Sequence, residues 1–209
     1  MRTLQHIAEH DESAANPRLN PNFSYLRVVV GGRVVYLALG YEDIAPHGYT
    51  EVWYSAEREV LRFQNGRFIG ATGLPVEWRS VSLPALPSWS ALSRAEQPFR
   101  WVRTRDVMPG YSVGVRDALV VRSISPPGQN ELQGVDSKSL TWFEEQAEPE
   151  IITGYSGYLP DKSLPPARYA VDFRDGKETV VYGEQCLAPD LCFTWQRWPV
   201  AIHSPTGKQ

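Results

Sequence analysis

Hydrophobic and polar residues alternate in short runs along most of the chain, and turn-forming residues separate these runs. The first two runs are Tyr25–Val30 and Arg33–Leu39, which lie on either side of Gly31-Gly32. Two runs rich in β-branched residues around a two-residue glycine turn predict a β-hairpin.

A second hairpin is predicted at Asn65-Gly66, because this dipeptide readily adopts the two positive φ angles of a type I′ turn. Its strands are expected at Val60–Gln64 and Arg67–Thr72. A third hairpin joins Ala167–Phe173 to Glu178–Tyr182. Further extended segments are predicted at Glu51–Ser55, Val76–Leu83, Phe99–Arg105, Ser112–Ser123, Leu140–Gln146 and Cys192–Trp198.

Only one segment has a helical pattern. It is Ser88–Glu96, which follows Pro87 and has Ser88 in position to cap the first turn. About a dozen strands and one short helix are therefore expected, which makes the chain an all-β protein.

Residues 1–24 are polar and contain Asn16–Asn22 with two Asn-Pro steps, so they are expected to form a leader before the fold. Residues 25–209 are expected to form a single β domain. Two segments rich in Pro and Gly, Ser125–Asn130 and Ser156–Pro166, have strand-like runs on both sides. We therefore interpret them as long loops of one domain and not as linkers.

Composition and charge exclude several protein classes. The 209 residues include 21 basic and 24 acidic side chains, with a net charge of −3. The sequence pI of about 5.8 argues against a nucleic-acid-binding domain, which usually has a pI above about 9. An apolar fraction of 42% is too high for a disordered tail, and no apolar run approaches the roughly 20 residues of a membrane-spanning helix.

The chain has two cysteines, Cys186 and Cys192, around a short segment that contains the turn-forming pair Pro189-Asp190. We expect them to form a disulfide, which requires an oxidising compartment such as a periplasm. The alternative is a pair of free thiols in a reducing cytosol. No metal site is expected, because a closed zinc site uses four ligands and the only histidines are His6, His10, His47 and His203.

One serine motif is a possible catalytic signal. Gly110-Tyr111-Ser112-Val113-Gly114 matches the G-x-S-x-G nucleophile elbow, and Asp136 or Asp172 with His203 would complete the order Ser, Asp, His. A nucleophile elbow needs a helix after the serine, whereas Val115–Val121 has a strand pattern. A hydrolytic role for Ser112 is therefore disfavoured.

Paired carboxylates are a second catalytic possibility. Glu144 and Glu145 are adjacent, so on a strand they point to opposite faces. Glycoside hydrolysis needs two carboxyl groups about 5 to 9.5 Å apart across one bond, and the separation of distant pairs such as Glu51 and Glu145 stays open. A polysaccharide-modifying hydrolase is therefore an alternative. Nucleotide, dinucleotide and metalloprotease motifs are absent, and no cofactor is expected.

Seven tryptophans are the remaining chemical signal. Indole rings stack on the apolar faces of sugars, and neighbouring arginines such as Arg197 donate to sugar hydroxyls. The alternative is that these side chains fill the core, where most tryptophans are found, and that the arginines only solubilise the surface. The candidate polysaccharide-binding residues are Trp53, Arg67, Trp78, Arg79, Trp195 and Trp198.

Several of these features occur together in Glu51–Leu74, where Trp53 precedes Ser55-Ala56, a strand ends at Asn65-Gly66-Arg67, and Thr72-Gly73-Leu74 follows. This block resembles the YjbF/GfcB family of bacterial lipoproteins, which are encoded with exopolysaccharide and group 4 capsule genes. Supporting features are Tyr25–Leu39, Trp142-Phe143-Glu144, Gln185–Cys192 and Trp195–Pro199.

The resemblance implies a strongly curved or barrel-like antiparallel sheet, with one or two short helices, and a place in the periplasm in association with the outer membrane. It implies an accessory protein in surface polysaccharide production or export, with no catalytic residues. Family members have a lipoprotein signal and an acylated cysteine, but Met1–Glu12 contains neither. We therefore expect either a trimmed sequence or a protein without a lipid anchor.

We expect a non-enzymatic envelope protein that binds the surface polysaccharide or proteins of its secretion machinery. Binding to nucleic acid is not expected, and contact with a membrane is expected only through a lipid anchor. Besides the hydrolase, a second alternative is a lipid-binding protein, because closed or strongly bent sheets often hold an apolar cavity.

Overall fold

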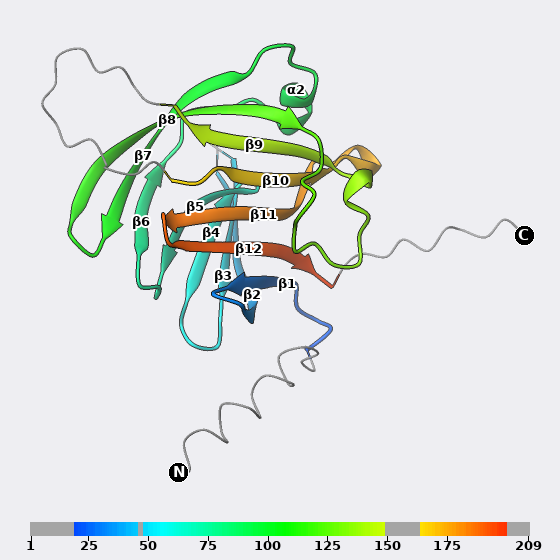
Figure 1. Cartoon of the computed structure of the whole chain (residues 1–209). Helices are drawn as coiled ribbons and strands as arrows, with labels where there is room; N and C mark the ends of the chain where they lie inside the picture. Colours follow the sequence, from blue (N-terminus) through cyan, green and yellow to red (C-terminus); the bar gives the residue numbers. More distant parts are fainter. Residues whose placement is uncertain (1–18, 46–47, 149–163, 200–209) are drawn as a thin grey trace, which may run out of the picture.

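The computed structural model describes residues 19–45, 48–148 and 164–199. In these residues twelve strands form one closed antiparallel barrel (Figure 1). Each strand pairs with its neighbours in the sequence, and β1 pairs with β12 to close the barrel. This architecture confirms the prediction of an all-β, barrel-like fold.

The strands are β1 (Tyr25–Val30), β2 (Arg33–Ala45), β3 (Gly48–Tyr54), β4 (Val60–Gln64), β5 (Arg67–Thr72), β6 (Glu77–Ser82), β7 (Phe99–Met108), β8 (Ser112–Ile124), β9 (Thr141–Ala147), β10 (Ala167–Asp172), β11 (Thr179–Ala188) and β12 (Leu191–Trp198). All three predicted hairpins are confirmed by the strand pairing.

The turn between β4 and β5 has the predicted geometry. Asn65 and Gly66 have φ angles of 49° and 76°, and Gln64 pairs with Arg67 across the turn. A Cβ atom added to Gly66 would lie 2.2 Å from Cγ2 of Val180 on β11. Glycine is therefore required here both by the backbone angle and by the close approach of another strand.

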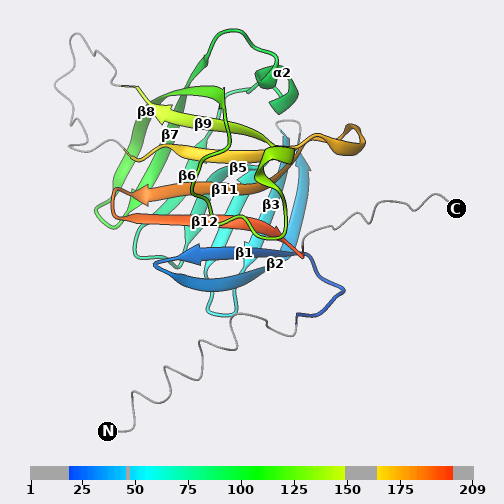
Figure 2. The same ribbon diagram turned by 45° about the vertical axis from the view of Figure 1, so that its right-hand side comes forward.

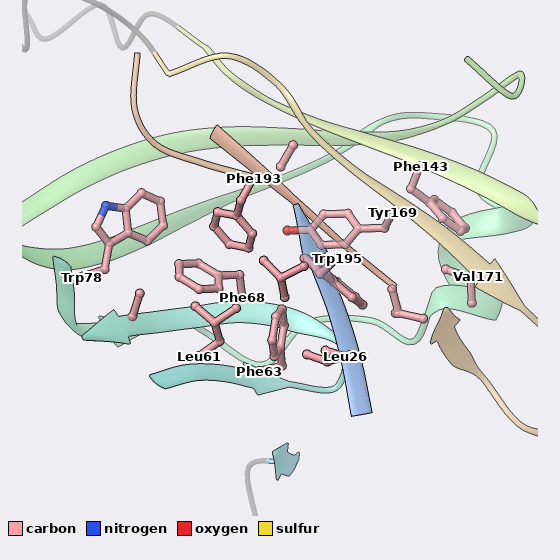
Figure 3. Close-up of a cluster of buried hydrophobic side chains, with 14 of the residues drawn as sticks. Leu26, Leu61, Phe63, Phe68, Trp78, Phe143, Tyr169, Val171, Phe193 and Trp195 are labelled. Carbon is pink, nitrogen blue, oxygen red and sulfur yellow. The ribbon is translucent and has the colours of Figure 1, made fainter. Parts of the chain in front are cut away.

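Aromatic side chains from opposite walls of the barrel meet in its interior. Figure 3 shows Phe63 of β4 and Phe68 of β5 facing Trp195 and Phe193 of β12. The ring centroids of Phe63 and Trp195 are 4.6 Å apart, and those of Phe68 and Phe193 are 5.4 Å apart. This part of the barrel is therefore a packed core.

The β8–β9 connection crosses the outer face of the barrel (Figure 2). The Glu131 amide donates to the Tyr182 hydroxyl at 3.1 Å, while Gln133 and Gln196 exchange two hydrogen bonds of 2.9 and 2.7 Å. It covers an outer apolar cluster that includes Trp142 and Tyr182. Since β8 and β9 also pair with each other, this segment, which includes Ser125–Asn130, is a loop within one sheet.

The predicted helix is present as α2 (Trp89–Ser93), in the connection between β6 and β7. The Ser88 side chain accepts a hydrogen bond from the Ala91 amide at 3.2 Å, so Ser88 is the N-cap as predicted. Helix α2 lies against one end of the barrel (Figure 2), where it buries Trp89 and Leu92. Two 3-10 turns complete the described secondary structure, η1 (Ser137–Ser139) and η2 (Arg174–Gly176).

The predicted disulfide joins Cys186 on β11 to Cys192 on β12, and the two residues face each other in the strand register. None of the described helices is long and apolar enough to span a bilayer. Most of the expected leader, much of Ser156–Pro166 and all four histidines lie outside the described residues.

Candidate functional site

A cavity of about 530 Å³ opens at the end of the barrel where α2 lies, and we call it the mouth pocket. Its volume falls in the range of roughly 300 to 1,000 Å³ that is common for small-molecule sites. The lining residues come from the ends of several strands and from α2. They are Tyr49, Glu51, Asn65, Gly66, Arg67, Leu86, Pro87, Ser88, Trp89, Glu178, Thr179, Val180 and Arg197.

Glu178 fixes the start of α2 at the wall of the mouth pocket. Its carboxylate accepts hydrogen bonds from the amides of Trp89, at 2.9 Å, and Ser90, at 3.1 Å. Partial burial raises the pKa of Glu178, but these hydrogen bonds outweigh it and hold the pKa below its ordinary value. The indole N–H of Trp89 donates to the Asn65 carbonyl at 3.0 Å, so α2 is tied to both neighbouring turns.

The Trp89 ring lies between the mouth pocket and the core. Its centroid is 5.0 Å from that of Phe143 and 5.1 Å from that of Tyr169. The Arg67 guanidinium carbon lies 3.9 Å from the centroid of the Trp89 ring, a cation–π stacking distance. Trp89 therefore supports Arg67 at the pocket.

Arg67 is 5% exposed, and in the part of the chain that the structure describes its guanidinium makes no hydrogen bond or ion pair. Burial lowers the pKa of Arg67, while the charges of Glu145 and Glu178 only partly offset that effect. Arg67 is therefore a largely buried cation, and its guanidinium donates no hydrogen bond to any residue that the structure describes.

Glu51 and Arg197 form an ion pair in the same pocket. Nη2 of Arg197 donates to both carboxylate oxygens of Glu51, at 2.8 and 2.7 Å, and Nε donates to the Val180 carbonyl at 3.0 Å. The Arg197 side chain is 30% exposed and that of Glu51 only 5%. The pair therefore holds a partly accessible guanidinium at the pocket.

A second ionic cluster lies inside the barrel. Asp117 of β8 accepts hydrogen bonds from Arg103 and Arg105 of β7, at 2.9 and 2.7 Å for the two Nε atoms. Burial opposes the charge of Asp117, but the two arginines outweigh it and lower its pKa. Both guanidinium groups also lie over the Trp78 ring, at 4.5 and 4.7 Å from its centroid.

Glu145 of β9 borders this cluster. Its nearest ion-pair contact is Nη1 of Arg103 at 3.8 Å, and its Oε2 atom has no hydrogen-bond partner in the described structure. Burial raises the pKa of Glu145 and also that of the neighbouring Tyr169 hydroxyl. With 3% of its surface exposed, Glu145 is out of reach of a polymer.

The structure corrects the surface role predicted for three tryptophans. Trp53 and Trp78 are 0% exposed and Trp195 is 2% exposed, because strand alternation directs all three into the barrel. Their rings fill the core and offer no exposed face to a sugar.

The other predicted residues lie in three different places. Arg67 lines the mouth pocket. Arg79 is 61% exposed at the opposite end of the barrel, where it pairs with Glu77 at 2.7 Å and lines a second cavity of about 390 Å³. Trp198 is half-buried and contacts Tyr36, with ring centroids 6.1 Å apart. The predicted set therefore does not form one site.

Sequence reasoning considered Trp89 only as one of the seven tryptophans and did not single it out. It did not identify Glu178 as a pocket residue, and it treated Glu51 only as half of a catalytic pair. The sequence contained one usable signal, the Ser88 cap, which located the start of the helix. That signal does not reveal that the helix folds over the barrel end.

The serine motif and the adjacent glutamates have the local structure that the sequence predicted. Ser112 is exposed and begins strand β8, so no helix follows it. Glu144 faces outward and pairs with Arg122 and Arg168, at 2.9 and 3.3 Å, whereas Glu145 points into the barrel. The adjacent carboxylates therefore lie on opposite faces of β9.

Comparison with known proteins gives a fold likeness. No protein-family model matches the chain, and no curated protein matches it in sequence. Among solved structures it is similar to the crystal structure of the hypothetical lipoprotein YmcC from Escherichia coli K12, with a TM-score of 0.58 and 16% identity. The match covers 94% of this chain and 93% of the other. At this identity the likeness establishes the shared fold alone.

Proposed function

We propose that this protein is a non-enzymatic accessory protein of the bacterial envelope that binds surface polysaccharide during exopolysaccharide or capsule production or export. The observation that carries the proposal is the mouth pocket, where the Tyr49 ring lies with Arg67, Arg197 and Glu51 around one cavity, while the buried Trp89 ring supports Arg67 from below. Aromatic rings beside fixed charged donors and acceptors are the groups that bind sugar rings and their hydroxyls.

Two further observations support an envelope location. The Cys186–Cys192 disulfide is the kind of bond that persists in oxidising compartments. The shared fold with a hypothetical lipoprotein is in keeping with the same compartment. The resemblance of the sequence to exopolysaccharide and capsule lipoproteins supports surface polysaccharide as the class of ligand.

The packed interior argues against the lipid-binding alternative. Phe63, Phe68, Phe193 and Trp195 fill the barrel between its walls, at the level where an acyl chain would have to lie. A polar ligand at the mouth pocket requires no rearrangement of these rings.

Isothermal titration with the polysaccharide of the source cell, sheared to short fragments, tests the proposal. We expect saturable binding by the native protein and at least tenfold weaker binding by Tyr49→Ala, because this change removes the aromatic ring that lines the pocket on the same face of β3 as Glu51. Tyr54→Ala, at an exposed position of the same strand away from the mouth pocket, is the matched control and should bind normally.

Fragment length is measured at the end of each titration. Shortened fragments would assign the protein to the hydrolases. Absence of binding would overturn the proposal and direct attention to protein partners of the secretion machinery. Equal loss of binding in both tyrosine variants would mean that the mouth pocket is not the site.

A further inference from the structure

The arginines directed into the barrel or its mouth are held by carboxylates, with one exception. Arg103 and Arg105 are hydrogen-bonded to Asp117, and Arg197 is hydrogen-bonded to Glu51. Arg67 alone in this group has no carboxylate at hydrogen-bonding distance in the described ranges, although it is 5% exposed. Burial of a charge without a hydrogen-bonded partner is costly, so such groups usually have a functional reason.

The acidic groups near Arg67 are already engaged or turned away. Both oxygens of Glu178 accept amides at the start of α2, and both oxygens of Glu51 accept from Arg197. Glu145 interacts with Arg67 electrostatically but does not accept a hydrogen bond from it. The free donors of Arg67 therefore face the mouth pocket, where water or a ligand can accept from them.

The contact with Trp89 leaves donors of Arg67 available. The guanidinium carbon lies 3.9 Å from the centroid of the Trp89 ring. A guanidinium carries five N–H donors that point outward in its plane, so contact with one ring does not engage all of them. Because Arg67 also lines the mouth pocket, a ligand in the pocket can approach this edge.

We infer that the mouth pocket selects a ligand that carries a carboxylate, with Arg67 as the residue that receives it. A carboxylate presents two acceptors in one plane and matches the guanidinium fork with two parallel hydrogen bonds. In a surface polysaccharide the source of this group is an acidic sugar such as a uronic acid. The inference deepens the proposed function and rests on it.

The test compares acidic sugars with neutral sugars of the same size. The probes are trisaccharides of galacturonate and of glucuronate, together with the neutral methyl ester of each. Hydrogen bonds between two charged groups are stronger than those to a neutral ester, so we expect each acid to bind at least about tenfold tighter than its ester. Sodium acetate, as a free carboxylate, should bind far more weakly, because the sugar ring supplies the remaining contacts.

Arg67→Met removes the charge but keeps an unbranched apolar side chain on Trp89. We expect this variant to lose the preference for the acid and to bind acid and ester with similar affinity. Arg79→Met, at the exposed site on the opposite end of the barrel, should keep the preference for the acid. Since the native cation lacks a carboxylate partner, Arg67→Met should also unfold at the same or a higher temperature than the native protein.

If Arg67→Met does not fold, Arg67→Lys replaces it; the point charge of lysine should retain part of the preference for the acid. Equal binding of acid and ester by the native protein would overturn the carboxylate inference and leave polysaccharide binding standing. Absence of binding by every trisaccharide would overturn both. An acid preference that persists in Arg67→Met would show that another residue receives the carboxylate.

Discussion

At the scale of single residues, the barrel interior combines apolar rings with charged groups. Asp117 stands out because one carboxylate serves two buried arginines, Arg103 and Arg105. The Trp78 ring lies beside both guanidinium groups. A buried ion cluster of this kind stabilises a fold only while every partner is present, since removal of one partner leaves charge uncompensated.

We therefore predict that Asp117→Asn lowers the free energy of unfolding by about 3 kcal/mol near neutral pH. Urea unfolding of the native and variant proteins measures the difference. The exposed turn residue Asp190 provides the control, because Asp190→Asn should change stability by less than about 0.5 kcal/mol. An Asp117→Asn variant as stable as the native protein would contradict the assigned role.

The same cluster predicts the sign of a pH dependence. The pKa of Asp117 is lower in the folded protein than in the unfolded chain, where an aspartate has a pKa of about 3.9. Its contribution is therefore present above about pH 4 and is lost as the pH falls through the folded-state pKa. The stability difference between the native protein and Asp117→Asn should shrink over that acidic range.

At the scale of elements, the turns decide where strands end and what they approach. The β4–β5 turn places Asn65 and Gly66 at the mouth pocket, and Gly66 packs directly against Val180. The Asn65 carbonyl accepts the indole N–H of Trp89. One two-residue turn thus sets the hairpin register and also helps to hold α2 over the barrel.

Gly66→Val should destabilise the protein by about 2 kcal/mol or more, because a β-branched residue would adopt a φ of 76° and collide with Val180. Thermal unfolding followed by circular dichroism measures the effect. The comparison is Gly128→Val in the β8–β9 loop, where an added Cβ meets nothing within 4 Å. Similar unfolding temperatures for both variants would refute the strained-turn argument.

At the scale of the whole molecule, closure of the barrel brings distant segments together. Pairing of β1 with β12 joins the two ends of the described chain, and the Glu51–Arg197 pair connects residues 146 positions apart. The Cys186–Cys192 bond lies on β11–β12, so it stabilises the hairpin that contributes to this closure.

Loss of this disulfide should lower the free energy of unfolding by roughly 2 kcal/mol, the value that the chain-entropy model gives for so short a loop. The double variant Cys186→Ser with Cys192→Ser measures it by chemical denaturation. Thiol titration of the denatured, unreduced native protein should detect no free thiol among these two residues. Two equivalents of thiol would contradict the bond and with it the argument for an oxidising compartment.

Local chemistry made much of the fold predictable from the sequence. Asn65-Gly66 and Gly31-Gly32 specify their turns through positive φ angles, and Ser88 marks a helix start because its side chain accepts the Ala91 amide. These signals act between residues close in the chain and need no knowledge of the remainder. The sequence therefore determined the class, the hairpins, the helix start and the cysteine pairing.

The binding site, in contrast, was decided by the tertiary structure. Alternation along a strand separates two faces but does not say which face closes inward, so the sequence left open whether Trp53, Trp78 and Trp195 lie in the core, as most tryptophans do, or on the surface. Arg67 gains its role only when α2 brings Trp89 against it and other arginines take the neighbouring carboxylates. Those contacts span distant parts of the chain, and barrel closure is the physical event that creates them.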